Sequence, residues 1–82
     1  MENGNLFLLG QKIRILRTAK GYSQEEFALL AGLDRAYYGG IERGERNVAA
    51  LNLIKIARAL NAEVGDLFPQ LADLALDEEA SQ

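Results

Sequence analysis

Apolar residues recur every three or four positions along most of this chain, a spacing that predicts helices. The first predicted helix covers residues 6–20, and Gly21 stands where a helix commonly ends in a left-handed conformation. One stripe of this helix consists of Leu9, Ile13, Leu16 and Lys20, and Leu6 and Ala19 lie beside it. The polar residues expected to face away from that stripe are Gln11, Lys12, Arg14 and Arg17.

Two short capped helices are predicted next. Ser23 and Glu26 have the spacing of a capping box, in which each side chain accepts a hydrogen bond from the other residue's backbone N–H. Gly32 permits a sharp turn, and Asp34 can cap a second helix over residues 35–43. Two helices joined by so short a turn form a helix-turn-helix, which favours a DNA-reading function.

A further helix is predicted between Asn47, as its N-cap, and Asn61, as its left-handed end. The core stripe of this helix is expected to consist of Leu51, Ile54, Ala57 and Leu60, widened by Leu53 and Ile56.

The last third of the chain carries an amphipathic segment, interrupted by Pro69, that has little core left to cover. We therefore predict a dimerisation surface at about residues 64–76, and the alternative is that this segment folds back on its own core. The residues expected at the interface are Leu67, Phe68, Leu71 and Leu74. Residues 1–76 would then form a single domain, and residues 77–82 a flexible acidic tail.

The composition argues against an enzyme, a metal-binding protein and a membrane protein. With 82 residues the chain suits one small domain, and the lack of Cys and His removes thiolate and imidazole chemistry. No Gly-rich phosphate loop or metal-ligand spacing is present, so we predict no enzymatic activity, no cofactor and no metal. No run of about 20 apolar residues or signal peptide is present, so we expect a cytoplasmic protein without a membrane partner.

The net charge of −3 is unusual for a DNA reader, but the charges are segregated. All nine Lys and Arg lie between Lys12 and Arg58, together with only five acidic residues. Six acidic residues and no basic residue follow Arg58. Because charges are screened beyond about 8 Å at physiological salt, the basic part can attract phosphate despite the acidic end.

A family resemblance is carried by SQEEFALLAGLDRAYYGGIERGERN, residues 23–47, and LNLIKIARALNAEVGDLF, residues 51–68. The chain resembles the phage repressor and Cro class of helix-turn-helix regulators, also called the XRE type. Within that class, LDRAYYGGIERGERNV is most similar to the controller proteins of restriction-modification systems. The resemblance implies a compact all-α bundle of five helices, with a possible helical C-terminal extension. It also implies a homodimer that binds a palindromic operator in double-stranded DNA.

The resemblance places the second helix of the motif in the major groove. It implies that Arg35, Ala36, Tyr37 and Gly40 lie near the bases, and Arg35 is the best candidate to bond a guanine. Ser23 and Gln24 at the start of the first motif helix would meet a phosphate. In the following loop, the phosphate-binding candidates are Arg43, Arg46 and Asn47. Tyr38 is expected in the core, and Glu42 in a salt bridge with Arg14 or Arg17.

Gly39 and Gly40 stand together in the predicted recognition helix, where each costs about 1 kcal/mol of helix stability relative to Ala. Either their backbone approaches another group closely, or packing of Ile41 and its neighbours holds the helix. The leading hypothesis is a transcriptional regulator, for which RNA polymerase is a candidate further partner. The alternatives are an antitoxin that acts mainly by binding a protein, and a general phage-type repressor.

Overall fold

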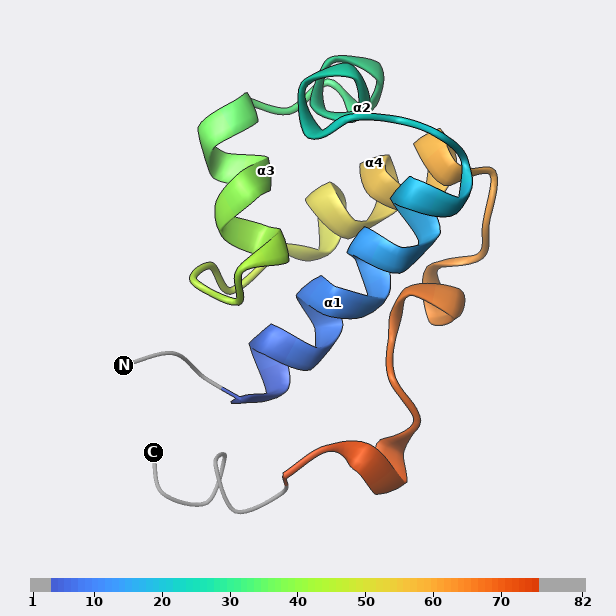
Figure 1. The fold of residues 1–82 in the computed structure, drawn as a ribbon. Coiled ribbons are helices and arrows are strands. Elements are labelled where there is room, and N and C mark those ends of the chain that lie inside the picture. The colour runs from blue at the N-terminus through green and yellow to red at the C-terminus, as the bar shows by residue number, and fades with distance from the viewer. Residues whose placement is uncertain (1–3, 76–82) are drawn as a thin grey trace.

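The computed structural model describes residues 4–75, which form four α-helices followed by two short 3-10 helices and contain no strand (Figure 1). The elements are α1 (Gly4–Ala19), α2 (Gln24–Ala31), α3 (Arg35–Glu42), α4 (Ala50–Leu60), η1 (Val64–Leu67) and η2 (Leu71–Asp73). The predicted all-α bundle is confirmed, with its fifth helical element present as η1. The predicted acidic tail, residues 77–82, lies outside the described residues.

The caps predicted for the helix-turn-helix are present. The Glu26 N–H donates to Ser23 Oγ at 3.0 Å, and the Ser23 N–H donates to Glu26 Oε1 at 2.9 Å. The Tyr37 N–H donates to Asp34 Oδ2 at 3.0 Å, which fixes the start of α3. Gly32, with φ of 74°, makes the left-handed turn between α2 and α3.

The first and third helices touch backbone to backbone at Gly10, whose role the sequence did not reveal. A Cβ atom on Gly10 would lie 2.3 Å from the carbonyl oxygen of Ile41 and 2.6 Å from that of Glu42. No side chain fits in that space, so only glycine lets α1 approach the end of α3 this closely. The position of α3 is therefore fixed by direct contact with α1.

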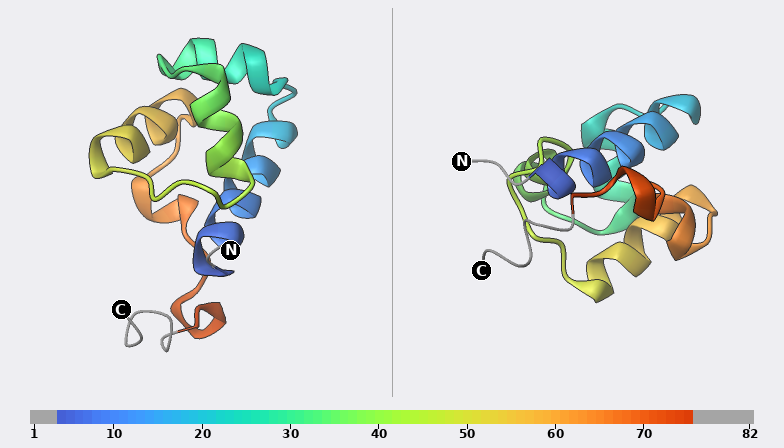
Figure 2. Two further views of the ribbon diagram at one scale, coloured as in Figure 1. Left: turned by 90° about the vertical axis from the view of Figure 1, so that its left-hand side faces the viewer. Right: turned by 90° about the horizontal axis from the view of Figure 1, so that it is seen from below.

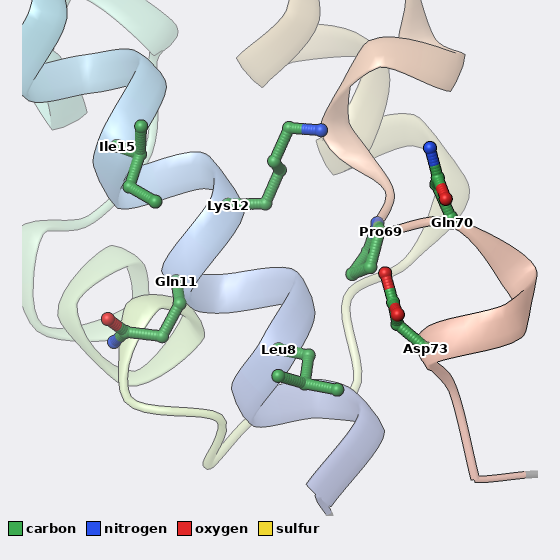
Figure 3. Close-up of a pocket in the computed structure, with 7 residues that line it drawn as sticks. All are labelled: Leu8, Gln11, Lys12, Ile15, Pro69, Gln70 and Asp73. Atoms are coloured by element: carbon green, nitrogen blue, oxygen red, sulfur yellow. The ribbon is translucent and has the colours of Figure 1, made fainter.

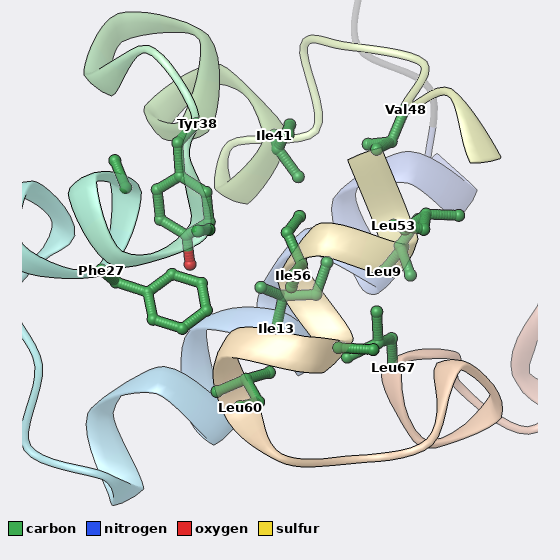
Figure 4. Packing of buried hydrophobic residues seen from close by; sticks show 13 residues of the cluster. Leu9, Ile13, Phe27, Tyr38, Ile41, Val48, Leu53, Ile56, Leu60 and Leu67 are labelled. Atoms are coloured by element: carbon green, nitrogen blue, oxygen red, sulfur yellow. The ribbon is translucent and has the colours of Figure 1, made fainter. Parts of the chain in front are cut away.

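One hydrophobic core joins all four α-helices and η1 (Figure 4). Phe27 of α2 and Tyr38 of α3 are completely buried, with ring centroids 5.2 Å apart. Ile13 of α1 and Ile56 of α4 are also completely buried. Because fully burying a side chain of this size is worth about 1.5–3 kcal/mol, this cluster holds the helix-turn-helix together.

The fourth helix corrects two predictions. It begins at Ala50, and Ala49 rather than Asn47 is its N-cap. Val48 is buried in the core, and the chain around it stays non-helical, so the helix starts two residues later than predicted. Asn61, with φ of 56°, ends the helix as predicted.

The core stripe of α4 also differs from the predicted one. Leu51 is 73% exposed and Ile54 is 40% exposed, so neither belongs to the core. The residues that α4 buries are Leu53, Ile56, Ala57 and Leu60. Both sets have helical spacing, and the sequence pattern alone did not distinguish them.

The C-terminal segment lies along α1 rather than forming a separate helical extension (Figure 2). The Asn5 side chain donates to the Ala75 carbonyl at 2.8 Å and accepts from the Ala75 N–H at 2.7 Å. An open groove remains between α1 and this segment, with Leu8 and Ile15 on one wall and Pro69 on the other (Figure 3).

The predicted interface residues of this segment have different environments. Leu67 is completely buried in the core of its own chain, so its assignment to a dimer interface was wrong. It packs inward because η1 contacts both α1 and α4. Phe68 and Leu71 are exposed, and Leu74 is half-buried. The segment thus folds back on the core at Leu67 and leaves apolar side chains at the surface beyond it.

Candidate nucleic-acid interface

The inner face of α3 is held by a buried ion pair between Glu42 and Arg17 of α1. Arg17 donates from Nε to Glu42 Oε2 at 2.6 Å and from Nη2 to Glu42 Oε1 at 3.1 Å. Its third nitrogen, Nη1, donates to the carbonyl oxygen of Tyr22 at 2.7 Å. Such a two-point contact fixes the orientation of both side chains. The buried pair therefore locks α3 onto α1.

Arg17 corrects one prediction and confirms another. It was expected to face away from the core, yet it is only 7% exposed. It lies four residues after Ile13, on the same helical face, and this spacing was the available signal. The predicted salt bridge of Glu42 is confirmed, with Arg17 rather than Arg14 as its partner.

Two further donors complete the Glu42 site. The Tyr38 hydroxyl donates to Glu42 Oε2, and Gln24 Nε2 donates to Glu42 Oε1 at 2.9 Å. Burial raises the pKa of Glu42, but the hydrogen bonds from Arg17, Tyr38 and Gln24 outweigh it and leave that pKa below its ordinary value. Burial and the adjacent carboxylate raise the pKa of Tyr38. Glu42 is therefore an ionised structural group that joins three helices.

Gln24 has a role that the sequence did not indicate. Its side-chain amide is bonded to Glu42, which ties the N-terminus of α2 to the end of α3. Ser23, one residue earlier, is the N-cap of α2 and is exposed. The phosphate contact expected of Gln24 and Ser23 stays a prediction, with Gln24 now held in place by a buried partner.

The outer face of α3 begins with exposed side chains. Arg35 and Ala36 occupy its first turn and are both exposed. Tyr37 is half-buried, and its hydroxyl accepts a hydrogen bond from Asn52 Nδ2 of α4 at 3.0 Å. Asn52 was not identified from the sequence, because the wrong residues of α4 were assigned to the face that packs on the core.

The loop after α3 places arginine side chains over the glycine pair. A Cβ on Gly40 would lie 3.0 Å from Arg46 Cγ, and a Cβ on Gly39 would lie 3.1 Å from Arg43 Nη1. Gly40 itself is buried, so the expectation that it faces the bases is corrected: Arg46 covers it. The Arg46 guanidinium carbon also lies 5.8 Å from the ring centroid of Tyr37.

The exposed charges on this side of the molecule are mainly positive. Arg35, Arg43 and Arg46 are exposed, as is Asn47. Glu45 is the exposed acid between residues 35 and 47, and it pairs with Arg43 at 3.1 Å. The hydrogen bond from Arg43 lowers the pKa of Glu45, so this carboxylate is ionised and offsets one arginine.

Comparison with known proteins identifies the fold. The sequence pattern described as "Helix-turn-helix" matches residues 13–67. The chain belongs to the helix-turn-helix family. The members of this family to which it is similar are transcription regulators rather than enzymes, and the chain is a DNA-binding transcriptional regulator of this type.

Several helix-turn-helix relatives are controller proteins. The control protein C.BamHI from Bacillus amyloliquefaciens is 44% identical over 68 residues, which cover 82% of this chain and 84% of the relative. The crystal structure of the restriction-modification controller protein C.AhdI from Aeromonas hydrophila has a TM-score of 0.76 and 57% identity over 77% of this chain and 96% of that chain. The biofilm regulator SinR, solved in complex with DNA, has a TM-score of 0.70 and 37% identity over 72% of this chain and 95% of that chain.

Between residues 4 and 75, no helix is long and apolar enough to cross a membrane. Over the same residues, no group of three or more acidic side chains is arranged to hold a metal ion.

Proposed function

We propose that this protein is a homodimeric controller of a restriction-modification system that binds a palindromic operator through α3. The observation that carries the proposal is the exposed turn of Arg35 and Ala36 at the start of a helix whose opposite face is locked by Glu42. The 57% identity to C.AhdI supports the controller assignment. Acting on DNA, the protein would work in the cytoplasm and affect access of RNA polymerase to nearby promoters.

The proposed complex places α3 in the major groove, with its N-terminal turn at the base edges. The Arg35 guanidinium would bond O6 and N7 of a guanine, a contact worth about 1–3 kcal/mol of discrimination against other bases. Ala36 would contact a thymine methyl, and the ring of Tyr37 would lie beside the bases. The residues that would bind phosphate oxygens are Ser23, Gln24, Arg43, Arg46 and Asn47.

The dimer would bring two such helices into successive turns of the major groove, about 34 Å apart. Exposed apolar side chains on two adjacent elements favour a second copy as the partner. Leu51 and Ile54 lie one turn apart on α4. Val64 begins η1, which packs on α4, and Phe68 follows η1 directly. We propose this surface as the centre of the interface, with Leu71 and Leu74 at its margin.

DNA recognition is tested by selecting duplexes from a random-sequence library with the wild-type protein. We expect enrichment of a palindrome with half-sites about 10 bp apart. The Arg35→Ala variant should lose about tenfold to a hundredfold of its preference for that duplex over random DNA. The matched control is Arg58→Ala, which removes an exposed arginine from the last turn of α4. An unchanged affinity ratio for Arg35→Ala would contradict base reading by this residue.

The dimer surface is tested by sedimentation velocity of a variant that carries Leu51→Gln and Ile54→Gln. We expect this variant to sediment as a monomer and to bind the selected duplex more weakly. Leu29→Gln is the matched control, because Leu29 is also highly exposed but lies on α2. If only the pair Leu71→Gln and Leu74→Gln abolished the dimer, the interface would lie on the C-terminal segment instead.

The controller assignment predicts the neighbouring genes. We expect a DNA methyltransferase gene and an endonuclease gene beside this one, and the selected palindrome upstream of them. A toxin gene in that position, together with co-purification of its product, would favour the antitoxin alternative.

A further inference from the structure

The outer surface of α3 is built from two separate parts of the chain. Gly40 contributes no side chain, and the three atoms nearest to where its Cβ would be all belong to Arg46. These atoms are Cγ at 3.0 Å, Nε at 3.5 Å and Cδ at 3.8 Å. The stem of Arg46 therefore fills the space that a side chain at position 40 would occupy.

The place that Arg46 fills lies on the proposed DNA-binding face. Residues four apart on a helix are neighbours on one side, so Gly40 lies directly beyond Ala36. Ala36 is exposed in the first turn of α3. A small side chain followed by none leaves a shallow notch along this face, and Arg46 lies in it.

A second contact holds Arg46 in the notch. Its guanidinium lies over the ring of Tyr37, and the hydroxyl of that ring is bonded to Asn52 of α4. The negative face of an aromatic ring attracts a cation placed over it, so this contact stabilises the position of Arg46. The side chain is thus placed between a fixed ring on one side and the bare backbone of Gly40 on the other.

We infer that Gly40 is a positioning residue that acts through Arg46: its missing side chain seats the loop arginine on the recognition face of α3. This inference rests on the proposed function, in which that face meets DNA. It explains why a strong helix former is absent from the middle of α3, although glycine destabilises a helix interior. Because Gly40 has no side chain, the longer and charged side chain of Arg46 from the loop can occupy this place on α3.

The inference is tested with a double-mutant cycle of Gly40→Leu and Arg46→Ala, using the duplex that the wild-type protein selects. Leucine favours helix and fills the notch, so α3 should remain folded while Arg46 is displaced. Gly40→Ala, whose methyl would press on Arg46 Cγ by only a few tenths of an ångström, should have a smaller effect. Gly65→Ala is the control, because its methyl would point into open space.

We expect Arg46→Ala to weaken binding about tenfold, as for loss of a charged contact. Gly40→Leu should weaken binding to a similar extent, and the double variant should be no weaker than either. In both single variants the slope of log Kd against log salt concentration should fall by about 0.9 per subunit, because each subunit loses one phosphate contact. Gly65→Ala should bind as tightly as the wild type, and circular dichroism should show that every variant remains helical and folded.

Two results would overturn the inference. Wild-type affinity in Gly40→Leu would show that Arg46 does not need the notch, and multiplied losses in the double variant would show that the two residues act independently. Failure of the wild-type protein to enrich any sequence is a different result. It would contradict the proposed function itself, and the inference with it.

Discussion

The two faces of α3 are built by different rules. The inner face carries Tyr38 and Glu42, which are both almost completely buried. Tyr38 donates to Glu42, and Glu42 also accepts hydrogen bonds from α1 and α2. The outer face carries Arg35 and Ala36, which are exposed, and it is completed by Arg46 from the loop. The inner contacts are specific and mutually dependent, whereas the outer side chains have few partners within the chain.

Because of this difference, the residues that orient α3 within the protein are not those proposed to recognise DNA. The buried carboxylate fixes where α3 lies relative to α1 and α2, and every donor around it is satisfied within the protein. The outer side chains can then be replaced without disturbing the fold, since the core does not depend on them. A change on the inner face should therefore act mainly on stability, and a change on the outer face mainly on DNA binding.

Glu42→Ala should give the largest loss of stability. The substitution leaves Arg17 buried without its anionic partner and removes the acceptor of Tyr38 and Gln24. Breaking a buried pair in this way costs about 3–5 kcal/mol. Urea unfolding followed by circular dichroism would measure the change in the free energy of unfolding.

The matched control for this variant is Glu45→Ala, which removes the other Arg–Glu pair of the region. Glu45 and Arg43 are about half exposed, so solvent screens this pair and the loss should be far smaller than for Glu42→Ala. Equal losses in the two variants would contradict the distinction between the faces.

Tyr38 on the inner face and Tyr37 on the outer face allow the same comparison, because a change to Phe removes one hydroxyl group from each. Tyr38→Phe removes a buried hydroxyl that donates to a carboxylate and should cost about 1.5–3 kcal/mol in the free energy of unfolding. Tyr37→Phe removes a half-buried hydroxyl that accepts from Asn52 and should cost about 0.5–1.5 kcal/mol. Thermal melting of both variants would compare the two losses of stability. A larger loss for Tyr37→Phe would contradict the view that the inner face of α3 carries the stabilising contacts.

Acid should weaken the inner face through Glu42. The pKa of Glu42 is lower in the folded protein than its ordinary value of about 4.3, so its ionised form stabilises the fold. This contribution is complete above about pH 5 and is lost as the pH falls through the lowered pKa. Urea unfolding between pH 7 and pH 3 should show a steeper loss for the wild type than for Glu42→Gln. Parallel curves would mean that Glu42 does not titrate differently in the folded and unfolded states.

The parts of the fold that the sequence predicted are those governed by local chemistry. The capping box of Ser23 and Glu26, the Asp34 cap and the left-handed Asn61 each depend on a few neighbouring residues. They were correct because the hydrogen bonds that they make lie within one turn of the chain. The core position of Tyr38, expected from the place of this residue in the motif, was also correct.

The parts that failed depend on contacts between distant elements. Val48 enters the core and delays α4, and Leu67 packs between α1 and α4, although neither feature has a local signal. Arg17 shares a helical face with Ile13, but the partner that makes its burial favourable, Glu42, lies 25 residues along the chain. The seating of Arg46 over Gly40 was missed for the same reason, since it needs the path of a loop rather than the register of a helix.

Arg43→Gln should have the smallest effect on stability and still change DNA binding. Arg43 is 54% exposed in its pair with Glu45, so its loss should alter the free energy of unfolding by less than about 1 kcal/mol. If Arg43 contacts a phosphate, the slope of log Kd against log salt concentration should fall by about 0.9 per subunit, with the sequence preference unchanged. Fluorescence anisotropy at several salt concentrations would measure the slope, with Arg58→Gln as the control for loss of one exposed charge. An unchanged slope in Arg43→Gln would show that Arg43 does not contact DNA. Arg35 and Arg46 would then be the cationic side chains through which the outer face of α3 binds DNA.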